Sequence, residues 1–409
     1  MPTHVLGPVS SEERIPLLDA LRGFALCGIL VINIKVFSGF GLSLDAFPDA
    51  AARLGPGTDS VELLTKWFVD GKFYSIFSFL FGLGFSIQLA RSEGKPGWLG
   101  IYARRLRILL LFGLVHAFLL WFGDILWFYS LAGFALLAFR NLQPRTILIW
   151  AAVFLLLPIP FYAASYSIAP GYNTDNWVPN AIDLPTLMRL VPTAGYPVAL
   201  GLNLEGFLFE VKSKFFGGRF FSVLGMFLLG LCAGRLHILH EAERHRTLLK
   251  RFLLAGLAVG LAGSFASATM PSPFHLTVQG IYRLIAYVLG VHPLALAYIG
   301  AFALLWQYAA GRQMLSRFVP MGRMALSNYL MQTVLGQSIY QGYGLGWFGR
   351  MPTLVTMLVV LPSILLAQAL LSTWWLRHFR YGPAEWVWRQ ATYRRRLPLR
   401  IERPSEVVG

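Results

Sequence analysis

Ten long apolar stretches are the feature that most limits how this chain can fold. Most of them are long enough to cross the roughly 30 Å hydrocarbon core of a membrane as a helix. A single apolar segment in lipid becomes helical because a helix satisfies its own backbone hydrogen bonds. The stretches lie near residues 18–39, 67–90, 106–122, 125–140, 147–167, 217–236, 252–270, 293–310, 324–342 and 352–376. The sequence therefore predicts an all-α polytopic membrane protein with about ten transmembrane helices.

Composition and charge agree with this fold class. Hydrophobic residues make up 56% of the chain and charged residues 13%, a balance that soluble globular proteins do not show. The net charge of +16 would suit a nucleic-acid binder, but its distribution argues against that partner. With both termini in the cytoplasm, the cytoplasmic segments hold 25 of the 35 Lys and Arg residues and 9 of the 19 acids, as the positive-inside rule requires. We expect this charge to meet anionic lipid headgroups.

The apolar stretches divide into two groups of five. A polar, acidic loop follows the first stretch in place of a small-residue cleavage site, so we expect a retained span and not a signal peptide. Cys27 and Cys232 lie inside apolar stretches, where cysteine acts as a small hydrophobe, so no disulfide or metal site is expected. The predicted parts are a cytoplasmic N-terminus (1–17), a first helical bundle (18–167), an extracytoplasmic loop (168–215), a second bundle with an interfacial helix near 277–290 (216–376) and a basic cytoplasmic tail (377–409).

Charged residues mark the start of the first span. Arg14, Asp19 and Arg22 cluster where the chain enters the membrane, and Arg104 and Arg105 lie at the same face before the third span. Ionisable groups at such places are functional candidates. The ordinary alternative is a set of anchors that reach the headgroups, with one structural ion pair. Both interpretations stay open for these five residues.

His116 is the strongest candidate for a general base. It lies about 13 Å along a helix that starts near Arg107, in the middle of the bilayer, and Asp124 follows in the tight outer turn after that span. Histidine titrates near neutral pH and suits proton transfer. A buried structural histidine is the commoner case. His116 and Asp124 form the predicted catalytic pair, and a direct hydrogen bond between them stays open.

Further polar residues lie at the outer level of the predicted spans. Lys35 and Asp70 lie at this level. The position of any single cation there is equally well explained by a side chain that extends to the lipid headgroups. Paired polar residues at helical spacing, such as Asn328 and Gln332, often only join neighbouring helices. The predicted acceptor pocket consists of Asn33, Lys72, Tyr74, Arg219, Asn328 and Gln332.

Taken together, these segments resemble the YeiB family of bacterial membrane proteins, which carries the domain of unknown function 418. The resemblance covers most of the chain. It rests on the opening Arg14-Ile-Pro-Leu-Leu-Asp-Ala-Leu-Arg-Gly23 with Asn33 after it, and on the segments 70–82, 116–129, 218–230, 324–332 and 382–386. It implies a multi-pass protein of the bacterial cytoplasmic (inner) membrane.

The family is similar in turn to the transmembrane acyltransferases, through the opening Arg-x-x-x-Leu-Asp-x-Leu-Arg-Gly. That similarity implies transfer of an acyl group from a cytoplasmic donor, acetyl-CoA or another acyl-CoA, to an extracytoplasmic acceptor. The related lysosomal heparan enzyme has its catalytic histidine in the loop after the first span. Residues 40–66 here contain no histidine, so His116 is assigned by its chemistry.

On this hypothesis the donor site consists of Arg14, Asp19, Arg22, Arg104 and Arg105, because guanidinium groups bind phosphates. His116 would deprotonate the acceptor or carry the acyl group, with Asp124 or Asn33 orienting it. No metal is needed. A transporter of a small solute is the alternative class, and a sensor or assembly partner without catalysis is a third. The acceptor and the oligomeric state, including a homo-oligomer, stay open.

Overall fold

The computed structural model describes residues 14–40, 54–92, 95–168, 184–270 and 277–401. Within these ranges the regular structure is helical, apart from one isolated antiparallel bridge between Phe379 and Arg400. The helices are α1 (Pro16–Ser38), α4 (Thr58–Phe68), α5 (Lys72–Arg91), α6 (Trp98–Leu119), α7 (Leu126–Leu136), η1 (Leu137–Phe139), α8 (Pro144–Leu156), α9 (Pro158–Ile168), α10 (Leu184–Leu190), α11 (Tyr196–Phe216), α12 (Arg219–Arg235), α13 (Arg246–Thr269), α14 (Val278–Trp306), α15 (Ala309–Leu315), η2 (Ser316–Phe318), α16 (Val319–Arg323), α17 (Ala325–Tyr340), α18 (Thr353–Val355), η3 (Thr356–Val360), α19 (Leu361–His378) and α20 (Pro383–Tyr393).

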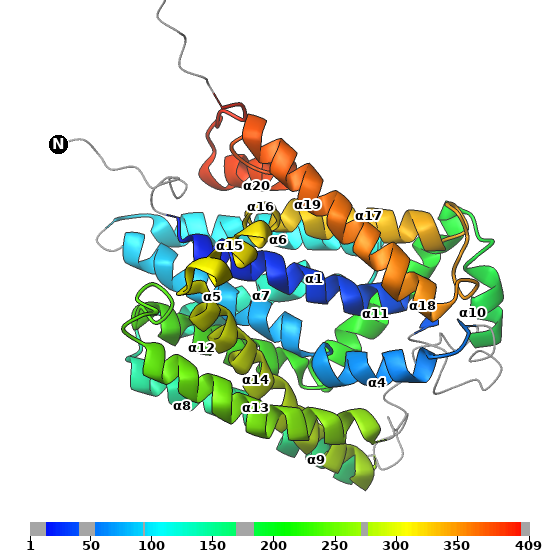
Figure 1. Ribbon diagram of the computed structural model, residues 1–409, viewed down its shortest axis with the longest axis horizontal. Coiled ribbons are helices and arrows are strands. Elements are labelled where there is room, and N and C mark those ends of the chain that lie inside the picture. The colour runs from blue at the N-terminus through cyan, green and yellow to red at the C-terminus, as the bar shows by residue number, and fades with distance from the viewer. Residues whose placement is uncertain (1–13, 41–53, 93–94, 169–183, 271–276, 402–409) are drawn as a thin grey trace, which may run out of the picture.

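The helices form one elongated bundle around α1. In Figure 1, α1 runs lengthwise through the middle, with α17 and α19 on one side and α12, α13 and α14 on the other. The buried side chains of α1 include Leu21, Leu26 and Ile34. Because α1 is buried along much of its length, its few polar side chains face other helices.

Six helical segments in the described ranges are long and apolar enough to cross a membrane. They are Pro16–Ser38, Thr58–Arg91, Pro144–Ile168, Arg246–Thr269, Val278–Trp306 and Thr353–His378. A seventh is the pair α11 and α12, bent by 64° at the break, if the two count together. The all-helical membrane class is confirmed, whereas the prediction of about ten transmembrane helices exceeds the six or seven segments found here. The reason is that α7 and α17 are short, and α6 carries three arginines in its first half.

Two predicted segments differ from the structure. The interfacial helix near 277–290 is the first half of α14, which continues through Pro293 to Trp306. The Thr277 side chain caps its start by accepting a 3.0 Å hydrogen bond from Gly280 N, and Pro293 lies inside the helix without ending it. The predicted loop 168–215 contains α10 and α11, while residues 169–183 lie outside the described ranges. The α11 helix lies against the end of α6, where Asn203 Nδ2 donates to Phe118 O at 3.3 Å.

Glycines allow the central helices to approach closely. An added Cβ at Gly230 of α12 would lie 1.9 Å from Phe79 O of α5, and one at Gly82 would lie 1.8 Å from Phe227 O. A Cβ at Gly322 of α16 would lie 1.7 Å from Asp19 O of α1. Small residues at such crossings are the usual means by which membrane helices pack. The last of these contacts fixes the opening charged motif beside α16.

Gly230→Ala is therefore expected to destabilise the bundle by about 1–3 kcal/mol, since the added methyl group meets backbone that has no room to move. The thermal unfolding midpoint in detergent measures this effect. Gly100→Ala in α6 is the matched control, because nothing lies within 4 Å of its added Cβ. Equal midpoints for the two variants would contradict the close α5–α12 contact.

The C-terminal helix α20 docks where several arginines gather, which we call the basic end of the bundle (Arg14, Arg104, Arg105, Arg323 and Arg389). Arg104 Nη1 donates to Thr392 O at 2.9 Å, and Trp388 Nε1 donates to Arg105 O at 3.0 Å. The chain after α20 folds back, since Arg380 N donates to Leu399 O at 2.8 Å. The described part of the predicted basic tail is thus an ordered component of this end (Figure 1).

Candidate functional site

A histidine and a carboxylate meet inside the bundle, at the turn between α6 and α7. His116 Nδ1 lies 2.8 Å from Asp124 Oδ2, and the side chains are 1% and 0% exposed. The turn brings them together because Leu120 N and Trp121 N both donate to His116 O, which folds the chain back over the end of α6. Gly113 makes room for this turn, since an added Cβ would lie 2.8 Å from Asp124 Oδ1.

Neighbouring groups fix the Asp124 carboxylate. Trp127 N donates to Oδ1 at 3.0 Å, and Tyr329 OH of α17 donates to Oδ2 at 3.4 Å. Lys214 Nζ donates to the Asp124 carbonyl at 2.8 Å and pairs with Glu210 at 2.8 Å. Sequence reasoning missed Tyr329 and Lys214. Tyr329 follows Asn328 in a segment already singled out, whereas Lys214 lay in a segment predicted to be a loop, where nothing marked it as buried.

The turn that carries the His116–Asp124 pair joins two helices of unequal length, α6 and α7. The α7 helix with η1 has 14 residues, Leu126–Phe139, and so advances about 21 Å from the turn, against about 35 Å for the 23 residues of α1. The turn therefore ends well short of the far end of the bundle. The α11 helix covers it, as the contact between Gly206 and Phe122 indicates.

A pocket of about 60 Å³ lies just beyond the pair, between α1, α6, α11 and α17. That volume has room for a few water molecules, at about 10–15 Å³ each. Its lining includes Val36, Phe37, Leu120, Trp121, Phe122, Val191, Ala199, Leu202, Asn203, Gly206, Gln337, Gln341 and Phe348. Phe37, Leu120 and Gln337 come from α1, the end of α6 and α17, and all three helices run away from the basic end (Figure 1).

Helical spacing places a polar layer directly beneath this pocket. Residues four apart share a helix face, so Asn33, His116 and Thr333 lie one turn below Phe37, Leu120 and Gln337. His116 Nε2 and Thr333 Oγ1 are buried and have no hydrogen-bond partner within the described part of the chain. Buried polar atoms without partners are costly. This layer is the feature of the site most suited to receive a polar ligand.

Two of the predicted pocket residues serve helix packing instead. Asn328 Nδ2 donates to Ser372 Oγ at 2.9 Å, and Gln332 Nε2 donates to Gln368 Oε1 at 3.0 Å. Both α17 residues are fully buried, and neither lines the pocket. They form hydrogen bonds that join α17 to α19, which is the common role of such residues in membrane helices.

The other predicted pocket residues form a separate polar region around α5 and α12. Lys72 is 1% exposed and donates to Lys66 O at 2.9 Å. The Arg219 guanidinium lies over the Tyr74 ring at 5.8 Å. It also interacts with Glu210, the partner of Lys214. The predicted acceptor pocket is thus divided, and only Asn33 belongs by helical spacing to the pocket next to His116.

At the basic end, five arginines gather (Arg14, Arg22, Arg105, Arg323 and Arg389), and we call them the arginine cluster. Among the described residues, Arg22 is the one member with an ion pair. Arg22 Nη1 pairs with Asp19 at 2.8 Å. Burial, with repulsion from Arg14 and Arg105, lowers the pKa of Arg389 to about 10. Arg323 Nε is buried without a hydrogen-bond partner among the described residues.

Arg389 and Arg323 were not predicted as site residues, because α20 meets α6, and α16 meets α1, only in the folded chain. Arg104 is not counted in the cluster. Its guanidinium donates to Thr392 O of α20, while that of Arg105 donates to Gln88 Oε1 at 3.0 Å. Mutual repulsion among cations that share one region is what a bound anion relieves. The cluster is therefore a candidate site for phosphate groups.

The chain is similar to known proteins along almost its entire length. Residues 233–395 match the family model described as a protein of unknown function, DUF418. The chain is 35% identical over 405 residues to the uncharacterized protein YxaH of Bacillus subtilis strain 168, covering 95% of this chain and 96% of YxaH. It is 28% identical over 404 residues to the uncharacterized protein YeiB of Escherichia coli K12, covering 93% and 97%. Both similarities extend over the N-terminal half, which lies outside the matched model segment.

Proposed function

The chain belongs to the YeiB family of DUF418 proteins, and from this premise we propose that it is a membrane-embedded acyltransferase. It would move an acetyl or other acyl group from a cytoplasmic CoA-type donor to an extracytoplasmic acceptor. The observation that carries the proposal is the buried His116–Asp124 pair at 2.8 Å. Its Nε2 has no hydrogen-bond partner among the described residues and lies beneath a pocket by helical spacing.

The pair suits general base catalysis. With Nδ1 2.8 Å from the Asp124 carboxylate, the imidazole would carry a proton on Nδ1 and present Nε2 as a proton acceptor. Nε2 takes the proton of an acceptor hydroxyl or amine while its oxygen or nitrogen bonds to the acyl carbon. The carbon–sulfur bond of the thioester breaks, and the CoA sulfur leaves with the proton that Nε2 returns. Such proton transfer typically contributes about 10²–10⁴-fold to a rate.

The arginine cluster supports the donor half of the proposal. Guanidinium groups bind phosphates through paired hydrogen bonds, and a CoA donor carries its phosphates far from its thioester on a flexible arm. Arg105 and His116 are eleven residues apart on α6, about 16 Å along the helix. The arm would cover that distance between the basic end and the pair.

We propose the following topology for this activity. The basic end faces the cytoplasm, so both termini are cytoplasmic by the positive-inside rule. The α6, α7 and α17 helices and the bent pair α11–α12 join the six clear segments, which makes ten crossings of the bacterial inner membrane. The α6–α7 turn then lies inside the bilayer, and the pocket above it opens toward the outer face.

Transport of a small solute is the second candidate. Its supporting observation is the 64° bend between α11 and α12 at Gly217 and Gly218, since broken helices line the substrate sites of many transporters. Under this alternative, His116 and the Glu210–Lys214 pair would belong to a proton or ion path. A transporter has no use for a thioester donor, which separates the two candidates.

Acetyl-CoA is expected to stabilise the detergent-solubilised protein, because a ligand that binds only the folded state stabilises by mass action, about 2.7 kcal/mol at 100 times its Kd. The measurement is the thermal unfolding midpoint against acetyl-CoA, free CoA and buffer. Arg22→Gln and Arg389→Gln should each raise the acetyl-CoA concentration needed for the same shift about tenfold.

Arg377→Gln is the matched control for these variants. Arg377 is an exposed cation in the last turn of α19, outside the arginine cluster, and its variant should respond like the wild type. No shift with millimolar acetyl-CoA, in a protein that unfolds cooperatively, would favour the transporter.

A further inference from the structure

One buried hydroxyl near the His116–Asp124 pair lacks a hydrogen-bond partner. Thr333 of α17 is 0% exposed, and its Oγ1 has no partner among the described residues. Other helix threonines in this chain donate to the carbonyl three or four residues before them, as Thr65 and Thr373 do at 2.9 Å and 2.7 Å. That bond is the usual way to satisfy a threonine inside a helix. Because buried polar atoms are normally hydrogen-bonded, the Thr333 hydroxyl is available to a ligand.

The α17 helix places Thr333 between the pair and the pocket beyond it. The ring of Tyr329, one turn before Thr333, lies 5.2 Å from the ring of His116. Gln337, one turn after Thr333, lines the pocket of about 60 Å³. Residues four apart share a helix face. The Thr333 side chain therefore lies at the level where His116 would meet an acceptor that enters the pocket.

The other hydrogen-bond donors around the pair are already engaged. Tyr329 OH donates to Asp124 Oδ2 at 3.4 Å and accepts from Ile125 N at 3.3 Å. Lys214 Nζ donates to the Asp124 carbonyl at 2.8 Å and lies 2.8 Å from Glu210 Oε2. Both side chains thus hold the turn between α6 and α7.

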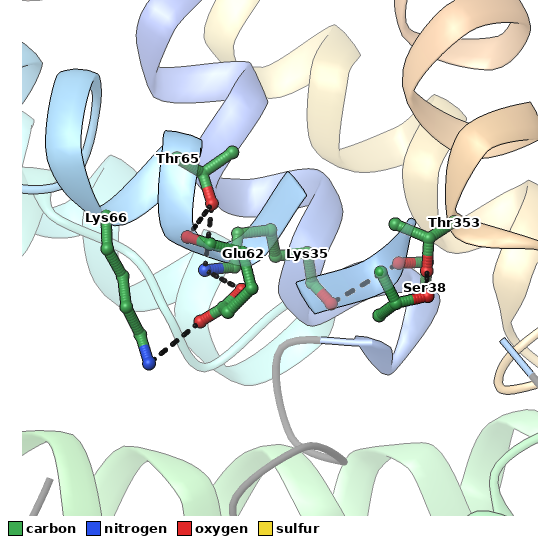
Figure 2. A network of polar contacts seen from close by, with 7 residues as sticks. Lys35, Ser38, Glu62, Thr65, Lys66 and Thr353 are labelled. Atoms are coloured by element: carbon green, nitrogen blue, oxygen red, sulfur yellow. Dashed lines mark hydrogen bonds and ion pairs between the residues drawn. The ribbon is translucent and has the colours of Figure 1, made fainter. Parts of the chain in front are cut away.

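Lys35, the cation of α1 nearest to Asn33 along the chain, points to another helix. Its Nζ lies 2.6 Å from Glu62 Oε2 and donates to Thr65 Oγ1 at 3.4 Å, and both partners belong to α4. Figure 2 shows the Lys35 and Lys66 side chains meeting at Glu62. Lys35 therefore serves the contact between α1 and α4. The polar layer beneath the pocket keeps two neutral donors, the Thr333 hydroxyl and the Asn33 amide.

We propose that the Thr333 hydroxyl, with the Asn33 amide of the same layer, donates a hydrogen bond to the carbonyl oxygen of the acyl group during transfer. This inference rests on the proposed function. As the acceptor oxygen or nitrogen bonds to the acyl carbon, an electron pair of the C=O bond moves onto the carbonyl oxygen, and the two donors stabilise its negative charge. The C=O bond forms again as the carbon–sulfur bond breaks, and His116 Nε2 passes the acceptor proton to the CoA sulfur. Donors fixed at a developing oxyanion act most strongly where water is excluded.

Thr333→Val keeps a side chain of similar shape and removes the hydroxyl. We expect kcat for acetyl transfer to fall about 10²–10³-fold, the usual effect of losing one such donor, with the KM for acetyl-CoA unchanged because the bond strengthens only in the transition state. The measurement is the initial rate at several acetyl-CoA concentrations in membrane vesicles that contain the full-length variant. The thermal unfolding midpoint should not fall, because the lost hydroxyl makes no hydrogen bond within the described chain.

Thr333→Ser keeps a hydroxyl and should retain most of the wild-type kcat. Thr373→Val is the matched control, since it removes a helix hydroxyl that donates to Ala369 O, and its kcat should equal that of the wild type. An active wild type with the same kcat in Thr333→Val would overturn this assignment alone. A wild type that transfers no acetyl group would overturn the proposed function and the assignment with it. A lower midpoint and a lower kcat in both Thr333 variants would show that the residue serves packing.

Discussion

His116→Ala is expected to lower acyl transfer by about 10²–10⁴-fold, the usual contribution of a positioned general base. The protein should still reach the membrane and fold, because the Asp124 carboxylate keeps its hydrogen bonds from Trp127 N and Tyr329 OH in the variant. The measurement is transfer of radiolabelled acetyl groups from acetyl-CoA to the extracytoplasmic material of membrane vesicles that contain the wild type or the variant.

Asp124→Asn should reduce transfer in the same direction, since an amide does not favour the Nδ1–H tautomer as a carboxylate does. His292→Ala is the matched control. His292 is also buried in a helix, 4% exposed, but its Nδ1 faces Ser75 Oγ at 3.4 Å and no carboxylate. Full transfer by His116→Ala would remove the histidine from the mechanism, and equal losses in both histidine variants would point to a general packing effect.

Glu385→Ala is expected to release α20 from the basic end, at a cost of about 3–5 kcal/mol. The Glu385 side chain caps the start of α17, where helix N–H groups lack partners. Its Oε1 accepts from Leu326 N at 2.7 Å and Ser327 N at 3.2 Å, and its Oε2 accepts from Ser327 Oγ at 2.5 Å. Losing the acceptor leaves several buried donors without partners, and each such bond to a charged group is worth about 1.5–3 kcal/mol.

Limited trypsin digestion measures this release, because Arg394, Arg395 and Arg396 directly follow α20. Cleavage there should become much faster in Glu385→Ala, and Glu385→Gln should fall between it and the wild type because the amide keeps one acceptor. Glu243→Ala removes an exposed carboxylate and should leave cleavage unchanged. An unchanged rate in Glu385→Ala would show that other contacts hold α20. Release should also weaken acetyl-CoA binding, since α20 carries Arg389 of the arginine cluster.

Predictions from the pattern of a single segment failed for residues whose partners come from distant parts of the chain. Glu62 and Lys214 lay in segments predicted to be loops, yet both are buried and paired with charged side chains of the bundle. Asn328 and Gln332 looked like pocket residues because polar groups in a span invite that interpretation. Their partners Ser372 and Gln368 are 44 and 36 residues away, and no helical period along one segment reveals such a pair.

The sequence by itself determined the fold class and the family, and it singled out two candidate site residues. The length of an apolar segment can be read locally from the sequence, and a single segment crosses lipid only as a helix. The composition was therefore enough to predict the fold class. His116 and Asp124 stood out because ionisable groups in a membrane span are costly and rare. Only the tertiary structure decided that they lie 2.8 Å apart, that Arg389 from α20 joins the opening motif, and that the predicted acceptor pocket is divided. These outcomes depend on which helices cross at glycines such as Gly230 and Gly322, because close packing between distant segments sets the geometry of every side chain between them.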